Sequence, residues 1–501
     1  MSNYTKVVLA ASKPKSDVAH RLEAQASFRV LILGDFSRQH ASVVGLKPNI
    51  KVDIDNFEDV LATINPQLNL ALDAHLPKVP ISIRELEDFH PDALFANVPL
   101  FNEFSSLRQK LNTPATFQQA SSDLQKLLNF SVDGAVPRTV LQADTIENNT
   151  DTLQRLLGQP VQAGTVNAEG QIMRYIATMI NEHIVVDVAP QLAICLQAID
   201  KAVSALMRKI LHHPDFQALE AAWRSIYLLV SELEADAGLS LHLLDIGKTQ
   251  LFDDMVSSGK QLSNTDCYAH LIANGVNVYG EQPWSLLIGD FIFDGSDVDL
   301  ALLAALGDLA AHAGGPFIAA ADPLLLGIDN LMAQTDYQDW PVSSAEQQSR
   351  WQALRESDVA PWIGLTLPRV LQRLPYGADT DPVESFYFDE LADITEHEAL
   401  LWGNGAFHCA LLLGQSFVAQ GWQMQPGDYL DIIDLPAYIL PSPEGGKLQP
   451  CAEVCFNDNT IEKIIGQGIM PFMSHRQMNQ ARLARMQSIG SPLQALKGAW
   501  Q

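Results

Sequence analysis

Cysteine is scarce in this chain of 501 residues, which contains five: Cys195, Cys267, Cys409, Cys451 and Cys455. A disulfide framework normally uses an even number of cysteines in a small secreted chain, so this odd count favours reduced thiols. Cys451 and Cys455 lie close together, but no second Cys/His pair stands near them at the spacing of a zinc finger. We therefore expect neither disulfides nor a metal site.

Basic residues and long apolar runs are also few. The chain has 32 Lys and Arg against 59 Asp and Glu, a formal charge of -27, and such a surface repels nucleic acid and anionic membranes. Residues 1–25 lack the apolar core of a signal peptide. The most apolar stretch, residues 300–328, is interrupted by Asp308, His312 and Asp322, too often to cross a bilayer. We expect a cytoplasmic protein that neither binds nucleic acid nor inserts into a membrane.

Recognisable catalytic motifs are missing as well. Neither Gly-rich phosphate loop is present, and there is no nucleophile elbow. The acidic run that starts at Asp53 fails as a calcium loop, because Phe57 and Glu58 stand where an oxygen ligand and a glycine are needed. His212 and His213 point in different directions at a helix start, which favours capping over metal binding. An assembly component is thus favoured over an enzyme on an α/β frame, and no cofactor is expected.

The hydrophobic pattern predicts several domains with alternating strands and helices. Buried strands are expected at 28–33, 80–84, 239–246, 284–293, 316–320 and 361–367. Helical patterns cover 104–128, 190–211, 297–313 and 396–421, and a strand-to-helix change falls within 51–61. The β-α-β spacing favours a multidomain α/β fold with mixed sheets, flanking helices and a helical linker region.

The run from His212 to Val230 predicts an amphipathic helix. Phe216 and Trp223 recur on its apolar face, and Glu220 and Arg224, four residues apart, are expected to pair on an exposed side. This is the pattern of a helix that packs a core. We expect truncation of either aromatic side chain to impair folding by about 3–5 kcal/mol.

Two further cations form the remaining candidate site. Arg369 and Arg373 lie four residues apart in LPRVLQRLPYG, which we interpret as a short helix that carries Val370 and Leu374. Guanidinium groups bind carboxylates well, so these arginines are candidates for ion pairs at a domain junction, and binding of an external anion is the alternative. Reversing their charge is expected to affect domain docking.

Several blocks of the sequence resemble the two subunits of the contractile sheath of type VI secretion systems. FRVLILGDFSR from Phe28, KVDIDNFEDVL from Lys51 and ISIRELEDFHPDAL from Ile81 resemble the small subunit (TssB, also called VipA) in order and spacing. From about Ile172 onward the chain resembles the large subunit (TssC, VipB). The matching blocks include ILHHPDFQALEAAWRSIYLLV, QPWSLLIGDFIFD, GGPFIAAADPLLL, LRESDVAPWIGLTLPRVLQRLPYG and LWGNGAFHCALLL.

This resemblance implies a contractile-sheath-like fold and a structural role. In that family the two subunits form a stable heterodimer that polymerises helically around an inner tube, and contraction drives the tube outward. An AAA+ ATPase disassembles the sheath by engaging a helix near the start of the large subunit, a position that falls near Thr152–Leu157 here. The partners implied are sheath subunits, inner tube or baseplate proteins, and this ATPase.

The resemblance divides the chain into a polar tail (1–26), a small-subunit-like domain (27–128), a linker (129–170) and a large-subunit-like domain (171–501). Two departures from the family follow. Both likenesses lie in one polypeptide, and the ends lack the strands that neighbouring sheath subunits exchange, so strand addition between copies is expected to be weak. We therefore expect a specialised fused paralogue at a sheath end or junction; a soluble adaptor or assembly chaperone for sheath subunits is the alternative.

Overall fold

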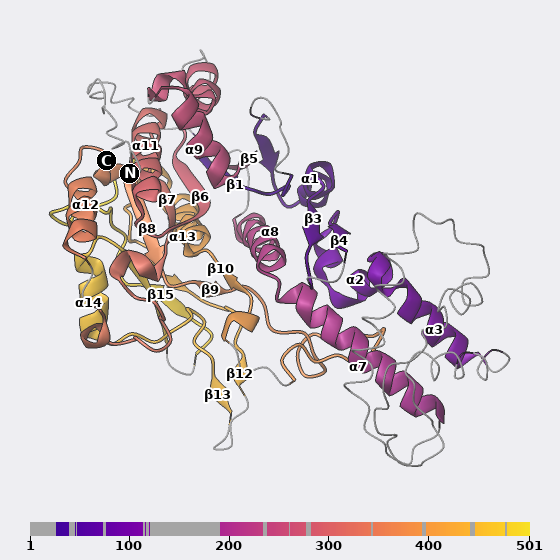
Figure 1. The fold of residues 1–501 in the computed structure, drawn as a ribbon. Helices are drawn as coiled ribbons and strands as arrows, with labels where there is room; N and C mark the ends of the chain where they lie inside the picture. Colours follow the sequence, from indigo (N-terminus) through magenta and orange to yellow (C-terminus); the bar gives the residue numbers. More distant parts are fainter. Residues whose placement is uncertain are drawn as a thin grey trace, which may run out of the picture. The chain divides into compact units, whose positions relative to one another are not determined.

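The computed structural model divides the chain into two compact units (Figure 1). It describes residues 27–39, 46, 48–73, 77–113, 116, 120, 191–233, 238–259, 261–276, 282–341, 344–392, 397–440, 446–475 and 478–500. Unit 1 comprises Met1–Pro66, Ala218–Leu374 and Leu400–Gln501, and unit 2 comprises Gln67–Gln217 and Pro375–Ala399. No helix within the described ranges is long and apolar enough to span a membrane.

A nine-stranded mixed sheet organises unit 1, with the order β11-β15-β14-β8-β7-β6-β1-β5-β2. The six strands β14, β8, β7, β6, β1 and β5 run parallel to their neighbours, whereas β2, β15 and β11 pair in antiparallel fashion at the two edges. The bounds are β1 Phe28–Gly34, β2 Ile50–Val52, β5 Leu239–Asp245, β6 Leu286–Phe293, β7 Phe317–Ala321, β8 Ile363–Leu367, β11 Asp431–Ile432, β14 Met470–Ser474 and β15 Ala481–Leu483. The predicted α/β class with a mixed sheet is confirmed.

The first strand of the chain occupies an interior position in this sheet. β1 pairs along its whole length with β5, from Phe28 opposite Leu239 onward, and its other edge pairs with β6. Its run FRVLILG is buried on both faces, as expected of a parallel strand covered by helices on each side. Strands separated by more than 200 residues in the sequence therefore form one hydrogen-bonded ladder.

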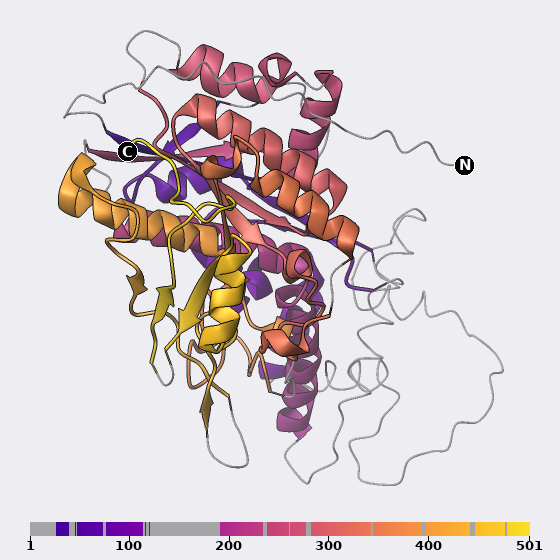
Figure 2. The same cartoon turned by 90° about the vertical axis from the view of Figure 1, so that its left-hand side faces the viewer.

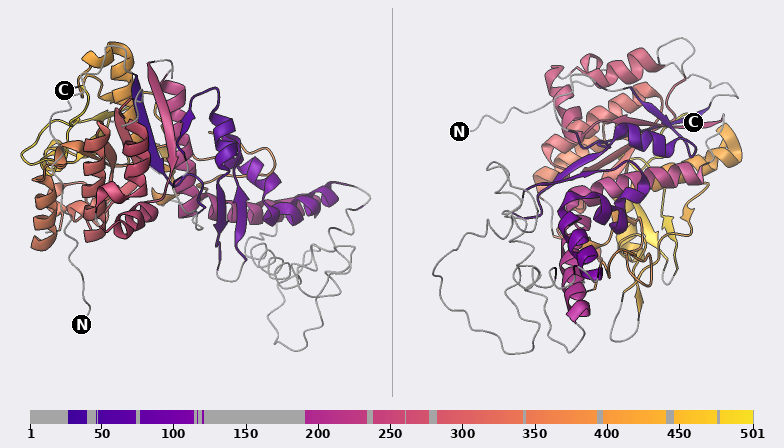
Figure 3. Two further views of the ribbon diagram at one scale, coloured as in Figure 1. Left: turned by 90° about the horizontal axis from the view of Figure 1, so that it is seen from above. Right: turned by 90° about the vertical axis from the view of Figure 1, so that its right-hand side faces the viewer.

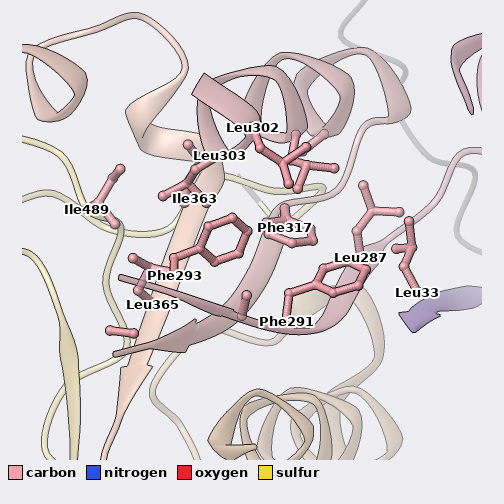
Figure 4. Packing of buried hydrophobic residues seen from close by; sticks show 14 of the residues in the cluster. Leu33, Leu287, Phe291, Phe293, Leu302, Leu303, Phe317, Ile363, Leu365 and Ile489 are labelled. Atoms are coloured by element: carbon pink, nitrogen blue, oxygen red, sulfur yellow. The ribbon is translucent and has the colours of Figure 1, made fainter. Parts of the chain in front are cut away.

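Two helices cover opposite faces of the sheet (Figure 2). α11 (Asp297–Ala313) contacts β6, β7 and β8, and α13 (Gly405–Gln420) contacts the same strands and β1. Figure 4 shows the α11 side, where Leu302 and Leu303 meet Phe317 and Ile363 in an apolar cluster of buried residues. α13 is apolar and buried on nearly all sides, the pattern of a helix enclosed by protein.

Unit 2 is built around one long helix, α7 (Gln191–Leu211). α3 (Asn102–Asn112) runs beside it (Figure 3), and Arg108 forms an ion pair with Asp200 of α7. A two-stranded antiparallel hairpin (β3 Gln67–Leu70, β4 Val79–Ser82) and α2 (Pro91–Asn97) complete the N-terminal part. The segment Pro375–Ala399 returns to this unit and is fastened to α7, because Ser204 donates to the carbonyl of Tyr387 at 2.9 Å.

Ten further α-helices and strands lie in the described parts of the two units. They are α1 Phe57–Ile64, α8 Pro214–Glu232, α9 Lys248–Ser257, α10 Asp266–Tyr268, α12 Ala345–Arg355, α14 Asp458–Gly466, β9 Val370–Leu371, β10 Trp402–Gly403, β12 Ile439–Leu440 and β13 Lys447–Leu448. A π-helical segment spans Ala269–Val276. α8 begins in unit 2 and continues into unit 1.

The structure corrects two predicted helices. The segment after Pro368 is the strand β9, which pairs with β10, so Arg369 and Arg373 do not lie on a helix. The helix expected over 396–421 begins only at Gly405, where the side chain of Asn404 accepts a hydrogen bond from the N–H of Ala406 and caps it. The predicted tail (1–26), linker (129–170) and Thr152–Leu157, and the second part of the helical pattern at 104–128, lie outside the described residues.

Candidate functional site: buried arginine–glutamate pairs in unit 1

α8 carries both predicted aromatic residues, and both are fully buried. Phe216 packs edge-on against Phe89 within unit 2. Trp223 lies in unit 1 between Phe36 and Phe57, with ring centroids 6.0 and 5.9 Å away, and its indole N–H donates to the carbonyl of Phe36 at 3.4 Å. The helix therefore packs a core, as its sequence pattern predicts.

Trp223→Phe should destabilise unit 1 by about 1–3 kcal/mol, because it removes the indole hydrogen bond and leaves part of the tightly packed site empty. Urea unfolding followed by circular dichroism measures this loss. Tyr227→Phe is a matched control, since Tyr227 lies on the same helix, is 40% exposed and packs on Phe57 through its ring. Equal effects of the two variants would contradict a core role for Trp223.

A fully buried carboxylate, Glu220, lies one turn before Arg224 on α8. Its Oε1 accepts from Arg373 Nε at 2.7 Å and from Arg224 Nε at 2.8 Å, and its Oε2 accepts from Arg373 Nη2 at 3.3 Å. The predicted pair of Glu220 with Arg224 is present. The prediction that it is exposed was wrong, because Arg373 covers the carboxylate and is itself buried.

The second predicted arginine, Arg369, binds a different carboxylate. Its backbone N–H donates to Glu453 Oε2 at 3.0 Å, and its Nε and Nη2 donate to Glu453 Oε1 at 3.2 and 2.5 Å. Glu453 is buried and has a left-handed backbone with φ of 51°. A fork of guanidinium donors on one carboxylate is a strong, directional contact.

Together these two ion pairs connect the residues on either side of β9 to other elements of unit 1. After β9, Arg373 binds Glu220 of α8, and Ser225 of α8 donates to Gln372 Oε1 at 3.0 Å. Before β9, Arg369 binds Glu453, which lies in a loop. Both guanidinium groups are bonded to carboxylates, which favours the predicted ion-pair role over binding of an external anion. Because both pairs lie within unit 1, the predicted place of these pairs at a domain junction was wrong.

Two carboxylates to which the sequence motifs assign no role lie near the carboxyl end of β1. Asp35 follows β1 and Asp290 lies in β6, the strand beside it. Both stand in the repeated tripeptide Gly-Asp-Phe after an apolar run, and this repeat was the signal available in the sequence. Arg38 lies 3.8 Å from Asp35. The group is therefore an acidic pair with the cation of Arg38 beside it.

Burial raises the pKa of Asp290 to about 6; the charge of Arg38 and a hydrogen bond from Asn404 oppose the rise, and the charge of Asp35 adds to it. The folded chain thus binds this proton more tightly than the unfolded chain, where the value is near 3.8. The contribution of Asp290 to stability therefore declines as the pH rises from about 4 to about 6 and is constant above.

Asp290→Asn should remove this dependence, so the stability of the variant relative to the wild type should rise between pH 4 and pH 6. Urea midpoints at several pH values measure the difference. Asp253→Asn, at an exposed position of α9, is the control. A difference between Asp290→Asn and wild type that stays constant with pH would contradict the raised pKa.

The histidines and cysteines fit structural roles. His213 Nδ1 accepts from the N–H of Asp215 at 3.2 Å at the start of α8, which is the predicted capping contact. His212 Nε2 lies 3.6 Å from the buried Glu390 within unit 2. None of the five cysteines, all of which are among the described residues, forms a disulfide, and Cys451 Sγ donates to the carbonyl of Pro436 at 3.3 Å.

Comparison with known proteins identifies both parts of the chain. Residues 194–490 match the VipB family model, described as "EvpB/VC_A0108, tail sheath N-terminal domain". Residues 16–144 match the VipA family model, described as "Type VI secretion system, VipA, VC_A0107 or Hcp2". The type VI secretion system sheath protein TssC1 of Pseudomonas aeruginosa is 30% identical over 366 residues, which cover 70% of this chain and 73% of that protein. Because the VipB match alone spans more than half of the sequence, the chain belongs to the type VI secretion sheath protein family.

Proposed function

We propose that this protein is a structural component of a type VI secretion sheath in which one polypeptide supplies both sheath-protein parts. The observation that carries the proposal is the place of β1 and β2. They belong to the VipA-matched part, yet they pair with β5 and β6 of the VipB-matched part in one sheet. The two parts therefore build one core, as a sheath building block requires.

The covalent linkage has a physical consequence. A covalent connection converts association of two subunits into an intramolecular step, with an effective concentration that can be on the order of millimolar. It also fixes a one-to-one ratio of the two parts. Such a chain suits a place where few copies must assemble reliably, and we propose a specialised position at a sheath end or junction.

The partners proposed are type VI secretion sheath subunits and, at such a position, inner tube or baseplate proteins; the AAA+ disassembly ATPase is a further candidate. We propose a cytoplasmic location for the protein. We assign it no catalytic activity, because the polar groups described above bond to one another within the fold. A thermal-shift screen with nucleotides and divalent metals should accordingly show no saturable shift.

Electron microscopy of the purified full chain, alone and mixed with ordinary sheath subunits of the same organism, tests the proposal. We expect the protein at the ends or junctions of sheaths, located by a gold-labelled tag. Long helical sheaths of this chain alone would contradict the specialised position. Failure to bind any sheath subunit would contradict the sheath role. Binding to free subunits combined with absence from finished sheaths would favour an adaptor or assembly chaperone instead.

A further inference from the structure

A pocket of about 700 Å³ opens in unit 1 between α12 and α14. Tyr337, Trp340 and Trp351 supply aromatic surface, and four glutamine side chains supply amide donors and acceptors. Its volume lies within the range of ligand pockets. The described residues that line it include the cations Arg355 and Lys463 and no carboxylate. For a protein with a formal charge of -27, this is an unusual local excess of positive charge.

Arg355 is buried, and the exposed carboxylate of the neighbouring Glu356 interacts with its charge without forming an ion pair. Arg355 is 6% exposed, its Nε donates to the carbonyl of Ile489 at 2.8 Å, and its Nη2 donates to that of Gly466 at 3.0 Å. Nη1 lies 3.5 Å from Gln352 Oε1, longer than an ordinary hydrogen bond. Within the described ranges no ion pair joins Arg355 to a carboxylate, in contrast to the buried Arg373.

Buried charges in proteins are normally paired, because removing an ion from water costs several kcal/mol. The carbonyl of Gly466, at the C-terminal end of α14, compensates Arg355 only in part. Lys463 is exposed on the last turn of the same helix. The pocket therefore favours a ligand that brings a carboxylate together with an aromatic or apolar group.

The chain itself presents a segment of this chemistry in unit 2. No Lys or Arg occurs between Arg373 and Lys447, and the segment Asp379–Tyr387 carries three acidic residues. Asp379, Asp381 and Glu384 are exposed, and Tyr387 is 76% exposed.

The conformation of this segment is fixed by polar contacts. Asp92 accepts from the N–H groups of Glu384 and Ser385 at 2.9 and 2.8 Å, and Ser204 holds the carbonyl of Tyr387. An exposed aromatic side chain on a fixed backbone loses little conformational entropy on binding, as the anchor residues of protein interfaces require.

We propose that the pocket of unit 1 receives the segment Asp379–Tyr387 of a second copy of this chain, with Tyr387 against the pocket's aromatic side chains and the acidic residues near Lys463 and Arg355. Pocket and segment are different surfaces, so the contact between two copies is heterologous. The contact would serve the sheath role proposed above, and it can be measured without any sheath subunit.

Sedimentation velocity of the full chain over a range of concentrations tests this contact. We expect reversible self-association that weakens at high salt, because the contact pairs opposite charges. Lys463→Glu and Tyr387→Ala change exposed side chains and should each raise the dissociation constant at least about tenfold. Lys51→Glu is the matched control, since Lys51 is exposed on β2, at the far edge of the sheet from the strands near α14; it should leave association unchanged.

Exchanging the charges of the two proposed partner residues tests the contact most directly. Glu384→Lys alone should weaken association, and combining it with Lys463→Glu should restore at least part of the lost affinity. A chain that stays monomeric at every concentration would overturn the proposal. So would association that responds to Lys463→Glu but not to changes at Glu384 and Tyr387, because the pocket would then take a different acidic partner. Neither result depends on whether the chain joins a sheath.

Discussion

Ile32→Asp should leave unit 1 unfolded. Ile32 is fully buried in β1, and its strand lies between β5 and β6. Its register partners in these strands, Leu243 and Ile288, are apolar and buried, so an ionised carboxylate would be placed in apolar surroundings. The cost of burying it is comparable with the total stability of a typical domain, about 5–15 kcal/mol. Far-UV circular dichroism and hydrogen exchange in β5 and β6 should both show loss of the sheet.

Ile32→Val is the matched control, with an expected loss of about 0.5–1.5 kcal/mol. The comparison separates loss of the strand from the small effect of any change at this position. A folded Ile32→Asp protein with near-normal protection of β5 and β6 would contradict the interior position of β1.

Arg373→Met should destabilise unit 1 by about 3–5 kcal/mol, because it removes the guanidinium group that donates to both carboxylate oxygens of the fully buried Glu220. Urea unfolding at neutral pH measures the loss. The double variant Glu220→Leu with Arg373→Met should recover part of it, since both members of the buried pair are then apolar.

Arg482→Met provides the control for this prediction. Arg482 binds both oxygens of Asp431 at 2.9 and 2.8 Å, but this pair is exposed. Exposed pairs contribute about 0–1 kcal/mol. Equal losses at Arg373 and Arg482 would show that burial of Glu220 does not decide the strength of its ion pairs.

The sequence predicted the central elements of the fold well, because their pattern is local. Residues that are close in sequence suffice to predict the strands β1, β6 and β7, from their apolar runs, and the helix α8, from its apolar face. β9 was missed because Val370 and Leu374 also fit a helical spacing. The partner that makes this segment a strand, Trp402–Gly403, lies far along the chain. The short edge strands β11 and β15 have only two and three residues and no alternation to detect.

The candidate site shows the same limit. The spacing of Glu220 and Arg224 predicts their pairing, but the burial of Glu220 depends on Arg373, which lies 153 residues away. Glu453 stands 84 residues after Arg369, and no local pattern connects the two. Ion pairs of this kind follow from the fold, so a single sequence predicts the residue types and not the partners.

Cleavage of the chain between its two sheath-related parts tests the central claim most directly. A protease site introduced within residues 129–170 allows the intact, folded protein to be cut before size-exclusion chromatography. The account predicts that both fragments elute together, because β1 and β2 remain paired with β5 and β6, and that they separate only in denaturant as unit 1 unfolds. Separation of the fragments under native conditions would contradict a single core built from both parts.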